Sequence, residues 1–590
     1  MPTSQSVPPS LAQLEHSGHR ALRVVYGDAR ACRSAAHALM RPFSTVRWVG
    51  EVAPDRVERV ALTGTRRWLG SECDALVFDA HCGFDPNAFG AAAGTVRAGG
   101  LLVLLCPPLA QWPCADDPVN PRVCVHGHAI THSRYLARIA NRLAAFDCSL
   151  DDATAVTPAP DVAPSGEPWS PPSGPTRAQA AIVDALTRDV QQPGAFAAVI
   201  QADRGRGKSA TLGWLAARLV ERGVDLAVTA PSRRTADVLY RHALANWPAD
   251  VDRARLSFIA PDAIPDMAER VLLVDEAASL HLGLTAQILR HCRKVVFAGT
   301  VHGYEGAGRG FSTRFEQLLK HVAHRYRAIT LDEPIRWAPG DPLEACVNDL
   351  LMLDATTDSV RETARCDWVD RDALVAQEGP LRALYALLAQ AHYRTRPLDL
   401  RHLLDGPNLR VLVFGPVAHP IATALIAEEG EFTDGLLRDA IAAGTRRPRG
   451  HLLPQLLAWQ HREQDALALR WWRVVRIAVH PQLQRRGYGA QVLRWLAAQA
   501  ARAGVDALGS SFGGDPGTCR FWSRSGYAPV YLGHVREATS GQFSVAVVRP
   551  LSPRARTVFA NARHHFVGAL GARSDIDPGL AHQLRQADSA

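Results

Sequence analysis

The sequence predicts a multidomain α/β protein, and three observations lead to this fold class. With 590 residues, the chain is too long for one hydrophobic core. Short apolar runs typical of buried strands alternate with segments whose apolar residues recur at helical spacing, the pattern of sheets covered by helices. Residues 151–175 contain seven prolines among Ser, Gly and Asp, a composition that buries no core and is typical of a semi-stiff linker. We therefore expect separate α/β domains on the two sides of this linker.

The composition is that of a soluble globular protein, with 47% hydrophobic and 21% charged residues. No apolar run reaches the ~18 residues of a membrane span, and the first residues lack the pattern of a secretory signal. The eleven cysteines include no Cys-x-x-Cys pair, which argues against a disulfide framework. We expect a cytoplasmic protein without a membrane partner or an obligate protein partner. Its net charge of +8 permits an acidic partner such as nucleic acid.

The first domain, residues 1–150, is predicted to be Rossmann-like. Strands are expected at 22–26, 75–78 and 101–106 and helices at 29–40 and 133–146, an alternation that favours a parallel sheet. No glycine fingerprint for phosphate binding occurs in this domain, so we expect it to be non-catalytic. The first domain contains four potential metal ligands, Cys124, His126, His128 and His132. They lack the pairwise spacing of a zinc site, so we expect an ordinary loop or strand there.

The second domain, residues 176–355, contains a phosphate-binding motif. An apolar strand at 196–200 runs through a turn with Gly205 and Gly207 into Lys208, Ser209 and a helix expected at 210–220. A Gly-Lys-Ser triplet between strand and helix is typical of a P-loop, in which the lysine reaches the β- and γ-phosphates and the serine hydroxyl binds Mg²⁺. Ala202 stands where the general motif has its first glycine, and a plain surface turn is the alternative.

An acidic pair supports the nucleotide site. A strand expected at 270–274 ends in Asp275 and Glu276, which would bind Mg²⁺ and polarise the attacking water. Gln179 is a candidate for reading an adenine edge, with a solvated helix glutamine as the alternative. Arg336 is a candidate for stabilising the transferred phosphate, with a structural salt bridge as the alternative. Further strands are expected at 226–229 and 294–298, followed by a glycine-rich loop at 303–310.

A second strand–turn–helix unit lies within residues 356–550. Strands expected at 410–414, 421–427 and 471–479 precede the turn Gln-Arg-Arg-Gly-Tyr-Gly-Ala at 484–490 and a helix at 491–502. This turn lacks the Lys-Ser pair of a triphosphate site and resembles the pyrophosphate loop of the GNAT acetyltransferases, where backbone N–H groups hold coenzyme A. Phe521-Trp522 and Gly526-Tyr527 resemble a second element that contacts coenzyme A. His480 and His534 are candidates for accepting the proton of the attacking amine, with structural roles as the alternative.

A P-loop joined to a GNAT-like loop resembles one family, the tRNA(Met) cytidine acetyltransferases. Family-like strings extend over nearly the whole chain, at 79–81, 94–100, 202–209, 303–311, 333–337, 446–453 and 476–489. The resemblance implies a RecD-like helicase domain at 176–355, a GNAT domain at 356–550 and a short helical tail at 551–590. It also implies that this tail belongs to the tRNA-binding region.

The activity implied by the resemblance is acetylation of the N4 amine of the wobble cytidine in elongator tRNA(Met). The acetyl donor is acetyl-CoA, and ATP or GTP hydrolysis with Mg²⁺ drives the reaction. Positions matching the nucleotide site are Gln179, Gly205, Arg206, Gly207, Lys208, Ser209, Ala210 and Arg336. Positions matching the acetyl-CoA site are Ile477, Ala478, Val479, Gln484, Arg485, Arg486, Gly487, Tyr488, Gly489, Ala490 and Arg524.

Three further points qualify the resemblance. Arg446, Arg447 and Arg449 are candidates for holding RNA phosphates, with a merely solvated loop as the alternative. Gly517 stands where some members have a glutamate that contacts the cofactor. The tail from about Ser552 is short.

Two other functions remain alternatives. One is a nucleotide-regulated acetyltransferase that acts on another RNA or on a protein amine. The other is a non-enzymatic RNA chaperone whose GNAT domain has decayed, although the complete loop at 484–490 argues against decay.

Overall fold

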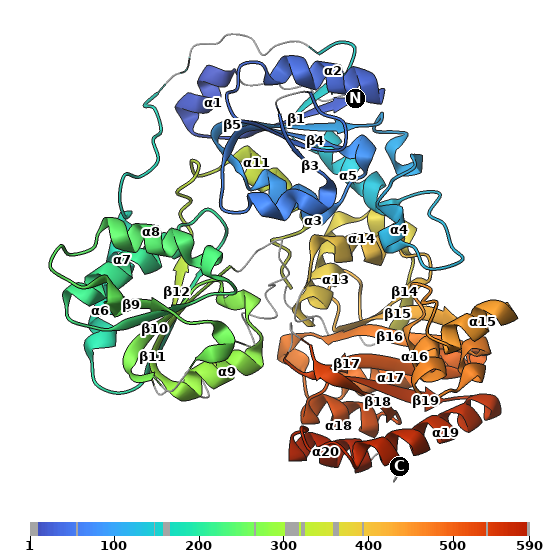
Figure 1. The fold of residues 1–590 in the computed structure, drawn as a ribbon. Coiled ribbons are helices and arrows are strands. Elements are labelled where there is room, and N and C mark those ends of the chain that lie inside the picture. The colour runs from blue at the N-terminus through green and yellow to red at the C-terminus, as the bar shows by residue number, and fades with distance from the viewer. Residues whose placement is uncertain are drawn as a thin grey trace. The chain divides into compact units, whose positions relative to one another are not determined.

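The computed structural model describes residues 10–54, 57–146, 148–156, 164, 166–264, 267–300, 315, 318–319, 325–357, 365–391, 395–537 and 541–586. Three sheets are distributed over two compact units (Figure 1). The first unit comprises Met1–Val119, Tyr135–Asp354 and Tyr393–Asp399, and the second comprises Asn120–Arg134, Ala355–His392 and Leu400–Ala590. Among the described residues, no helix has the length and apolarity needed to cross a membrane.

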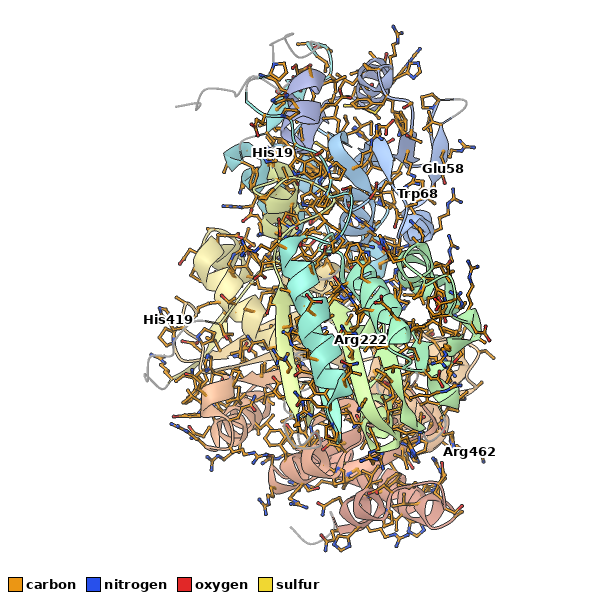
Figure 2. The ribbon with its side chains drawn as sticks, turned by 90° about the vertical axis from the view of Figure 1, so that its left-hand side faces the viewer. His19, Glu58, Trp68, Arg222, His419 and Arg462 are labelled. Atoms are coloured by element: carbon orange, nitrogen blue, oxygen red, sulfur yellow. The ribbon has the colours of Figure 1, made fainter. Side chains whose placement is uncertain are left out.

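The first sheet is parallel, in the order β3-β2-β4-β5-β1-β6. Its strands are β1 (Ala21–Tyr26), β2 (Val46–Val49), β3 (Glu58–Val60), β4 (Cys73–Asp79), β5 (Val96–Cys106) and β6 (Ser149–Asp152). At the β3 edge, the Trp68 indole donates a hydrogen bond to Glu58 (Figure 2). The predicted strands and the Rossmann-like pattern are confirmed. β6 shows that the sheet continues beyond the helix at which the domain was expected to end.

Helices from distant parts of the chain cover this sheet. Helix α2 (Ala29–Met40) packs on one face through Cys32, Ala36 and Met40. The other face carries α3 (Pro86–Ala93), α5 (Arg134–Ala145) and α11 (Pro342–Leu351) (Figure 1). Because α11 follows the second sheet in the chain, the region after the P-loop domain returns to the first domain.

The second sheet is also parallel, in the order β12-β7-β11-β10-β8-β9. Its strands are β7 (Phe196–Ala202), β8 (Leu226–Thr229), β9 (Leu256–Phe258), β10 (Met267–Val274), β11 (Cys292–Thr300) and β12 (Tyr326–Leu331). Helices α6 (Arg177–Gln191), α7 (Lys208–Glu221) and α8 (Asp237–Ala245) cover one face, and α9 (Leu282–His291) covers the other. Arg222, labelled in Figure 2, marks the end of α7.

This topology positions the predicted nucleotide site. The carboxyl ends of parallel strands meet at one edge of a sheet. Lys208 follows β7 and Asp275 follows β10, with only β11 between the two strands. The strands and the helix predicted for this sheet are confirmed, whereas the glycine-rich loop predicted at 303–310 lies outside the described residues.

The third sheet is mixed, in the order β13-β14-β15-β16-β17-β19-β18. Its strands are β13 (Cys366–Val369), β14 (Leu409–Phe414), β15 (Ala422–Gly430), β16 (Arg470–Val479), β17 (Ala507–Gly513), β18 (Ala528–Arg536) and β19 (Phe543–Pro550). β16 and β17 run parallel, and the other neighbours are antiparallel. Helices α17 (Tyr488–Arg502) and α18 (Pro516–Arg524) cover one face, and α16 (Leu452–Gln460) covers the other.

The predicted helical tail is confirmed as two helices, α19 (Pro553–Leu570) and α20 (Pro578–Arg585). They pack on the third sheet through buried side chains that include Val558, Phe566 and Leu580. The buried Arg563 donates hydrogen bonds to the carbonyls of Pro529 (2.9 Å) and Leu584 (3.0 Å). The tail is therefore part of the core of the second unit.

Candidate functional site

Two glycines shape the turn between β7 and α7. Gly205 (φ 79°) and Gly207 (φ 77°) have left-handed backbones, which residues with a β-carbon rarely adopt. A β-carbon on Gly205 would lie 2.8 Å from the Trp337 ring, and one on Gly207 would lie 2.5 Å from Gln179 Nε2. Gly207 is the N-cap of α7, and no side chain in the described part of the chain caps this helix. Its first N–H groups are therefore available to an anion.

Lys208 lies against this turn and is 7% exposed. Its ammonium donates to the carbonyls of Ala202 (3.3 Å) and Asp203 (3.1 Å). Burial lowers the pKa of Lys208, while the charges of Glu276 and Asp275 raise it. The structure thus brings the predicted lysine and the predicted acidic pair together.

Asp275, at the end of β10, is fully buried. Its Oδ1 accepts from the backbone N–H of Glu276 (3.0 Å), while its Oδ2 meets no hydrogen-bond donor among the described residues. Burial, and then the charge of Glu276, raise the pKa of Asp275 to about 7, while the nearby Ser209 hydroxyl lowers it. A buried carboxylate oxygen without a donor, beside a serine hydroxyl, fits the oxygen ligands that Mg²⁺ prefers.

Glu276 has a left-handed backbone (φ 48°). Its Oε2 accepts a hydrogen bond from the Thr300 hydroxyl (3.1 Å) at the end of β11. This contact orients the carboxylate of Glu276 at the edge of the sheet where Asp275 lies.

Gln179 is completely buried, so the alternative of a solvated glutamine is wrong. Its Oε1 accepts from the Thr176 N–H (2.9 Å) in a capping box that begins α6. Its Nε2 lies 3.4 Å from the Arg206 carbonyl oxygen. The side chain therefore joins α6 to the P-loop turn.

The segment 335–337 covers the same turn. The Ile335 N–H donates to the Gly205 carbonyl (2.9 Å), and the ring of Trp337 lies against Gly205. Between them, the Arg336 Nε lies 3.6 Å from a carboxylate oxygen of Glu72. Arg336 thus has an ion pair and also lies within the segment that packs on the P-loop, so both interpretations of its role have support.

The third sheet contains the geometry on which the second predicted site depends. β16 pairs with β17 from Trp471 to Val474 and no further along the described strands. Beyond that point β16 pairs with β15 and β17 with β19, and the register with β15 shifts between Val474 and Arg476. The two parallel strands therefore part, which leaves the β17-facing edge of residues 475–479 open.

An uncapped helix begins beside this opening. Gly487 (φ 86°) is the N-cap of α17, and no described side chain caps the helix. A β-carbon on Gly489 would lie 3.1 Å from Phe521 and 3.6 Å from Val479. The Gln484 side chain donates to the Val479 carbonyl (3.2 Å). The predicted loop and the end of β16 are thus brought together around free N–H groups.

The remaining candidates of this unit are more scattered. Arg485, Arg486 and Arg524 are exposed. His480 is buried directly after β16, and its backbone N–H donates to the Ile421 carbonyl (2.8 Å). His534 is exposed on β18, an edge strand separated from β16 by β17 and β19. The structure therefore does not bring the two histidines together.

Two of the three loop arginines have partners within the protein. The Arg447 guanidinium lies 4.3 Å from the centre of the Trp459 ring, and Arg449 donates to the Pro121 carbonyl. The Arg449 carbonyl in turn accepts from the His126 N–H (3.1 Å). The predicted His-rich segment is thus a loop that packs on residues 446–451, whereas Arg446 is exposed.

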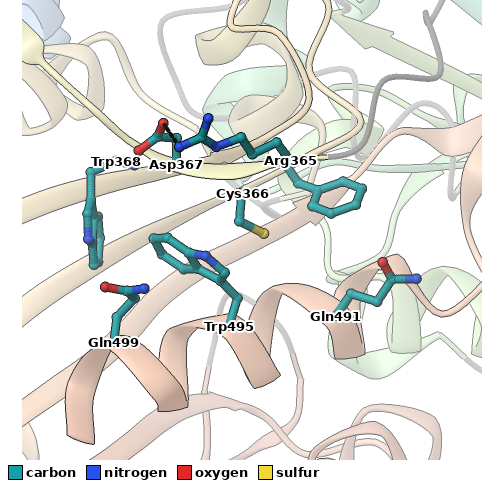
Figure 3. A pocket seen from close by; sticks show the side chains of 8 residues that line it. Arg365, Cys366, Asp367, Trp368, Gln491, Trp495 and Gln499 are labelled. Carbon is teal, nitrogen blue, oxygen red and sulfur yellow. Dashed lines mark hydrogen bonds and ion pairs between the residues drawn. The ribbon is translucent and has the colours of Figure 1, made fainter. Parts of the chain in front are cut away.

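A separate cavity of about 530 Å³ lies between β13 and the middle of α17 (Figure 3). Trp368 and Trp495 face it together with Gln491 and Gln499 of α17, and the Arg365–Asp367 ion pair lies at its β13 side. None of the residues predicted to bind acetyl-CoA lines this cavity.

Sequence analysis missed a group of residues around the P-loop: Arg20, Trp337, Asp341 and Glu344. Trp337 belongs to the family-like string 333–337, but no function was predicted for it. Arg20 and Asp341 lie 321 residues apart, and no local pattern connects them.

Three domain families match successive parts of the chain. Residues 1–150 match the N-terminal domain of tRNA(Met) cytidine acetyltransferase TmcA. Residues 199–354 match the helicase domain of RNA cytidine acetyltransferase NAT10/TcmA. Residues 383–503 and 497–552 match GNAT acetyltransferase 2.

Relatives that match more than nine tenths of this chain carry the name tRNA(Met) cytidine acetyltransferase TmcA. The protein of Nitrosococcus halophilus is 39% identical over 98% of this chain and 83% of its own length. The Haloferax volcanii protein is 34% identical over 96% of this chain and 81% of its own length. The Salmonella typhimurium protein is 36% identical over 92% of this chain and 78% of its own length. A solved ribosomal-protein-S18-alanine N-acetyltransferase from Escherichia coli matches 32% of this chain and 95% of its own, with 13% identity and a TM-score of 0.22.

Proposed function

Because the chain belongs to the tRNA(Met) cytidine acetyltransferase TmcA family, we propose that it forms N4-acetylcytidine at the wobble position of elongator tRNA(Met). The acetyl donor is acetyl-CoA, and hydrolysis of ATP or GTP with Mg²⁺ drives the reaction. The chain is an acetyltransferase with a helicase domain. The finer proposal concerns the acceptor, the nucleotide and the residues that act.

The observation that carries the acetyl-transfer part is the parting of β16 and β17 beside the uncapped N-terminus of α17. The open edge of Ile477, Ala478 and Val479 suits the amide groups of a pantetheine arm. The N–H groups at residues 484–490 suit a pyrophosphate. Arg524, the last residue of α18, is proposed to contact the same cofactor. When bound, acetyl-CoA supplies a thioester whose carbonyl carbon is open to attack.

These residues fix the thioester, and catalysis depends on bringing the amine to it. The cytidine N4 forms a C–N bond to the acetyl carbon, the C–S bond breaks, and the amine loses a proton. His480 is the better placed of the two candidate proton acceptors, because it follows β16 directly. His534 lies on an exposed edge strand, and we assign it no direct part.

The nucleotide site is proposed to use the turn and the acidic pair. The N–H groups of residues 205–210 hold phosphates, and Lys208 turns from its two backbone carbonyls to the β- and γ-phosphates. Ser209 and Asp275 hold Mg²⁺, Glu276 orients water, and Arg336 stabilises the transferred phosphate. Gln179 supports the turn through the Arg206 carbonyl.

Hydrolysis has a physical purpose in this scheme. The cytosine N4 lone pair is delocalised into the ring, and a stacked base must be exposed at a cost of roughly a few kcal/mol. We propose that the helicase domain remodels the anticodon loop to deliver the base. Arg446 and the C-terminal region 551–590 are the proposed contacts to the tRNA.

Nucleoside mass spectrometry tests the proposal. Unmodified tRNA(Met) is incubated with the protein, acetyl-CoA and Mg²⁺, with ATP, with GTP or without nucleotide. N4-acetylcytidine at the wobble base that depends on the nucleotide is expected. Folded protein that binds acetyl-CoA and hydrolyses ATP, but leaves the tRNA unmodified while acetylating another RNA or a protein amine, would contradict the proposed acceptor.

A further inference from the structure

Arg20, at the entrance to β1, is a buried arginine that holds a segment from the far end of the P-loop domain. It is 2% exposed. Its Nη2 and Nε lie 2.8 and 3.1 Å from Asp341 Oδ1, and its backbone N–H donates to Oδ2 (2.7 Å). Its Nη1 donates to the Val96 carbonyl (3.2 Å) of the first domain. A buried pair of this kind tolerates the loss of one partner poorly.

The residues before Arg20 add to this attachment. The Gly18 carbonyl accepts from the Ala338 N–H (3.0 Å), and a ring nitrogen of His19 lies 3.0 Å from the Pro339 carbonyl oxygen. His19 is labelled in Figure 2. Three consecutive residues of the first domain therefore hold the Ala338 and Pro339 backbone and the Asp341 side chain.

Trp337 carries this attachment to the P-loop. It is 3% exposed, and the Arg20 guanidinium lies 3.4 Å from the centre of its ring. The ring also meets Gly205, where a β-carbon would lie 2.8 Å away. Its indole N–H donates to Glu344 (3.0 Å). The same indole thus contacts the first domain, the P-loop turn and α11.

Glu344 closes the connection. It lies in the first turn of α11, where its N–H donates to the cap residue Asp341 (2.7 Å). Its carboxylate pairs with Arg206 of the P-loop, at 2.9 and 3.2 Å to the two terminal nitrogens. Arg206 is 9% exposed, so this pair fixes a guanidinium at the turn that receives phosphates.

We propose that Arg20, Trp337 and Glu344 are positioning residues for the nucleotide site, through which the first domain holds the P-loop in its binding shape. The proposal rests on the proposed nucleotide-driven function. A turn that is already ordered loses less entropy on binding. Loosening the connection therefore raises the concentration of nucleotide that is needed, while the bound complex still reacts.

The experiment measures KM and kcat for ATP hydrolysis by the full chain with tRNA(Met), together with affinity for a fluorescent ATP analogue. The variants are Arg20→Lys, Glu344→Gln and both together. Each single variant is expected to raise KM about tenfold and to change kcat less than about twofold, because uniform binding is lost. The double variant is expected to resemble the worse single variant, since Arg20 and Glu344 belong to one connection around Trp337, which either change already loosens.

Arg142→Ala is the matched control. Arg142 of the first domain pairs with Asp349 of the same helix α11 (2.8 Å), but neither residue touches the P-loop in the described structure. The KM of Arg142→Ala for ATP should stay within about twofold of the KM of the original chain, because only the docking of α11 is weakened. Equal KM increases in Arg142→Ala, or multiplied effects in the double variant, would overturn the proposal.

Two further measurements distinguish a failure of this proposal from a failure of the proposed function. Acetyl-CoA affinity is expected to be unchanged in all variants, which shows that the second unit is intact, and a kcat near the original value shows that the P-loop domain is folded. If tRNA(Met) is not acetylated, the proposed acceptor fails, while the affinities for the ATP analogue still support or overturn the positioning role. Unchanged analogue affinity in Glu344→Gln would overturn it.

Discussion

At the scale of single residues, the nucleotide site joins two charges that burial disfavours. Lys208 is 7% exposed and Asp275 is fully buried. Burial lowers the pKa of the lysine and raises that of the aspartate. Such opposed shifts are typical of sites that a charged ligand completes.

Replacement of Asp275 by asparagine is expected to change the pH dependence of stability. Its folded pKa of about 7 lies above the ordinary 3.8, so the unfolded chain releases the proton first as the pH rises. The original chain should therefore lose up to about 4 kcal/mol between pH 4 and pH 7, and the variant should not. Melting temperatures in EDTA measure this difference.

Added Mg²⁺ and nucleotide should raise the melting temperature of the original chain, which has Asp275, but not that of Asp275→Asn. Asp237→Asn, at an exposed aspartate of α8, serves as the control. A melting difference between Asp275→Asn and the original chain that is constant from pH 4 to pH 7 would contradict the prediction.

Gly205→Ala is expected to raise KM for ATP by more than about tenfold, because a left-handed alanine costs about 1 kcal/mol and its β-carbon also meets Trp337. Gly194→Ala is the control. Gly194 also has a left-handed backbone (φ 92°), lies outside the segment 335–341 that packs on the P-loop, and has no described atom within 4 Å of a β-carbon placed there. Steady-state kinetics of both variants isolate the contact with Trp337, and equal KM values would show that it has no effect.

At the scale of elements, His451 attaches the loop 446–451 to the third sheet. Its Nδ1 accepts from the Gly430 N–H at the end of β15 (2.9 Å), and its ring packs on Phe432. Burial lowers the pKa of His451 to about 4. Protonation would convert the accepting nitrogen into a donor and break this contact.

Acid is therefore expected to release this loop. Because the folded pKa is about 4 and the ordinary value is 6.5, the stabilisation is complete above pH 6.5. About 3 kcal/mol of it is lost as the pH falls from 6.5 to 4. Hydrogen exchange of the peptide around Gly430, corrected for intrinsic rates, measures the loss.

His451→Asn offers an oxygen in place of Nδ1 and does not titrate. Exchange around Gly430 in this variant should depend much less on pH over the same range. An unchanged pH profile would show that His451 does not hold the loop.

At the scale of the whole molecule, the two proposed reactions lie on different sheets, nucleotide hydrolysis on the second and acetyl transfer on the third. Lys208→Ala is expected to reduce acetylation of tRNA(Met) at least tenfold, which is the order of effect of one phosphate-contacting charge. Acetyl-CoA affinity should not change, because the opening between β16 and β17 belongs to a different unit. Calorimetry and nucleoside mass spectrometry measure the two effects.

Lys294→Ala is the control for this variant. Lys294 lies at the other end of the second sheet, where β11 begins its pairing with β7. Acetylation by Lys208→Ala at the original rate would show that hydrolysis is not coupled to acetyl transfer.

The features that depend on neighbouring residues in the chain could be predicted from the sequence. Strand, turn and helix follow one another around Gly207 and again around Gly487, so spacing and composition sufficed to place both helix N-termini. The buried state of Gln179 was not predictable, because it depends on contact with a turn 27 residues away. The pair of Arg20 and Asp341 is formed entirely by tertiary folding.

The segment 120–134 belongs to the second unit although it lies within the first third of the chain. Its Pro121 carbonyl accepts from Arg449, 328 residues later. During synthesis this segment leaves the ribosome long before the loop on which it packs exists. Domains generally fold as they emerge, yet the second unit has to wait for its C-terminal strands, with its earliest part already tethered on both sides to the first unit.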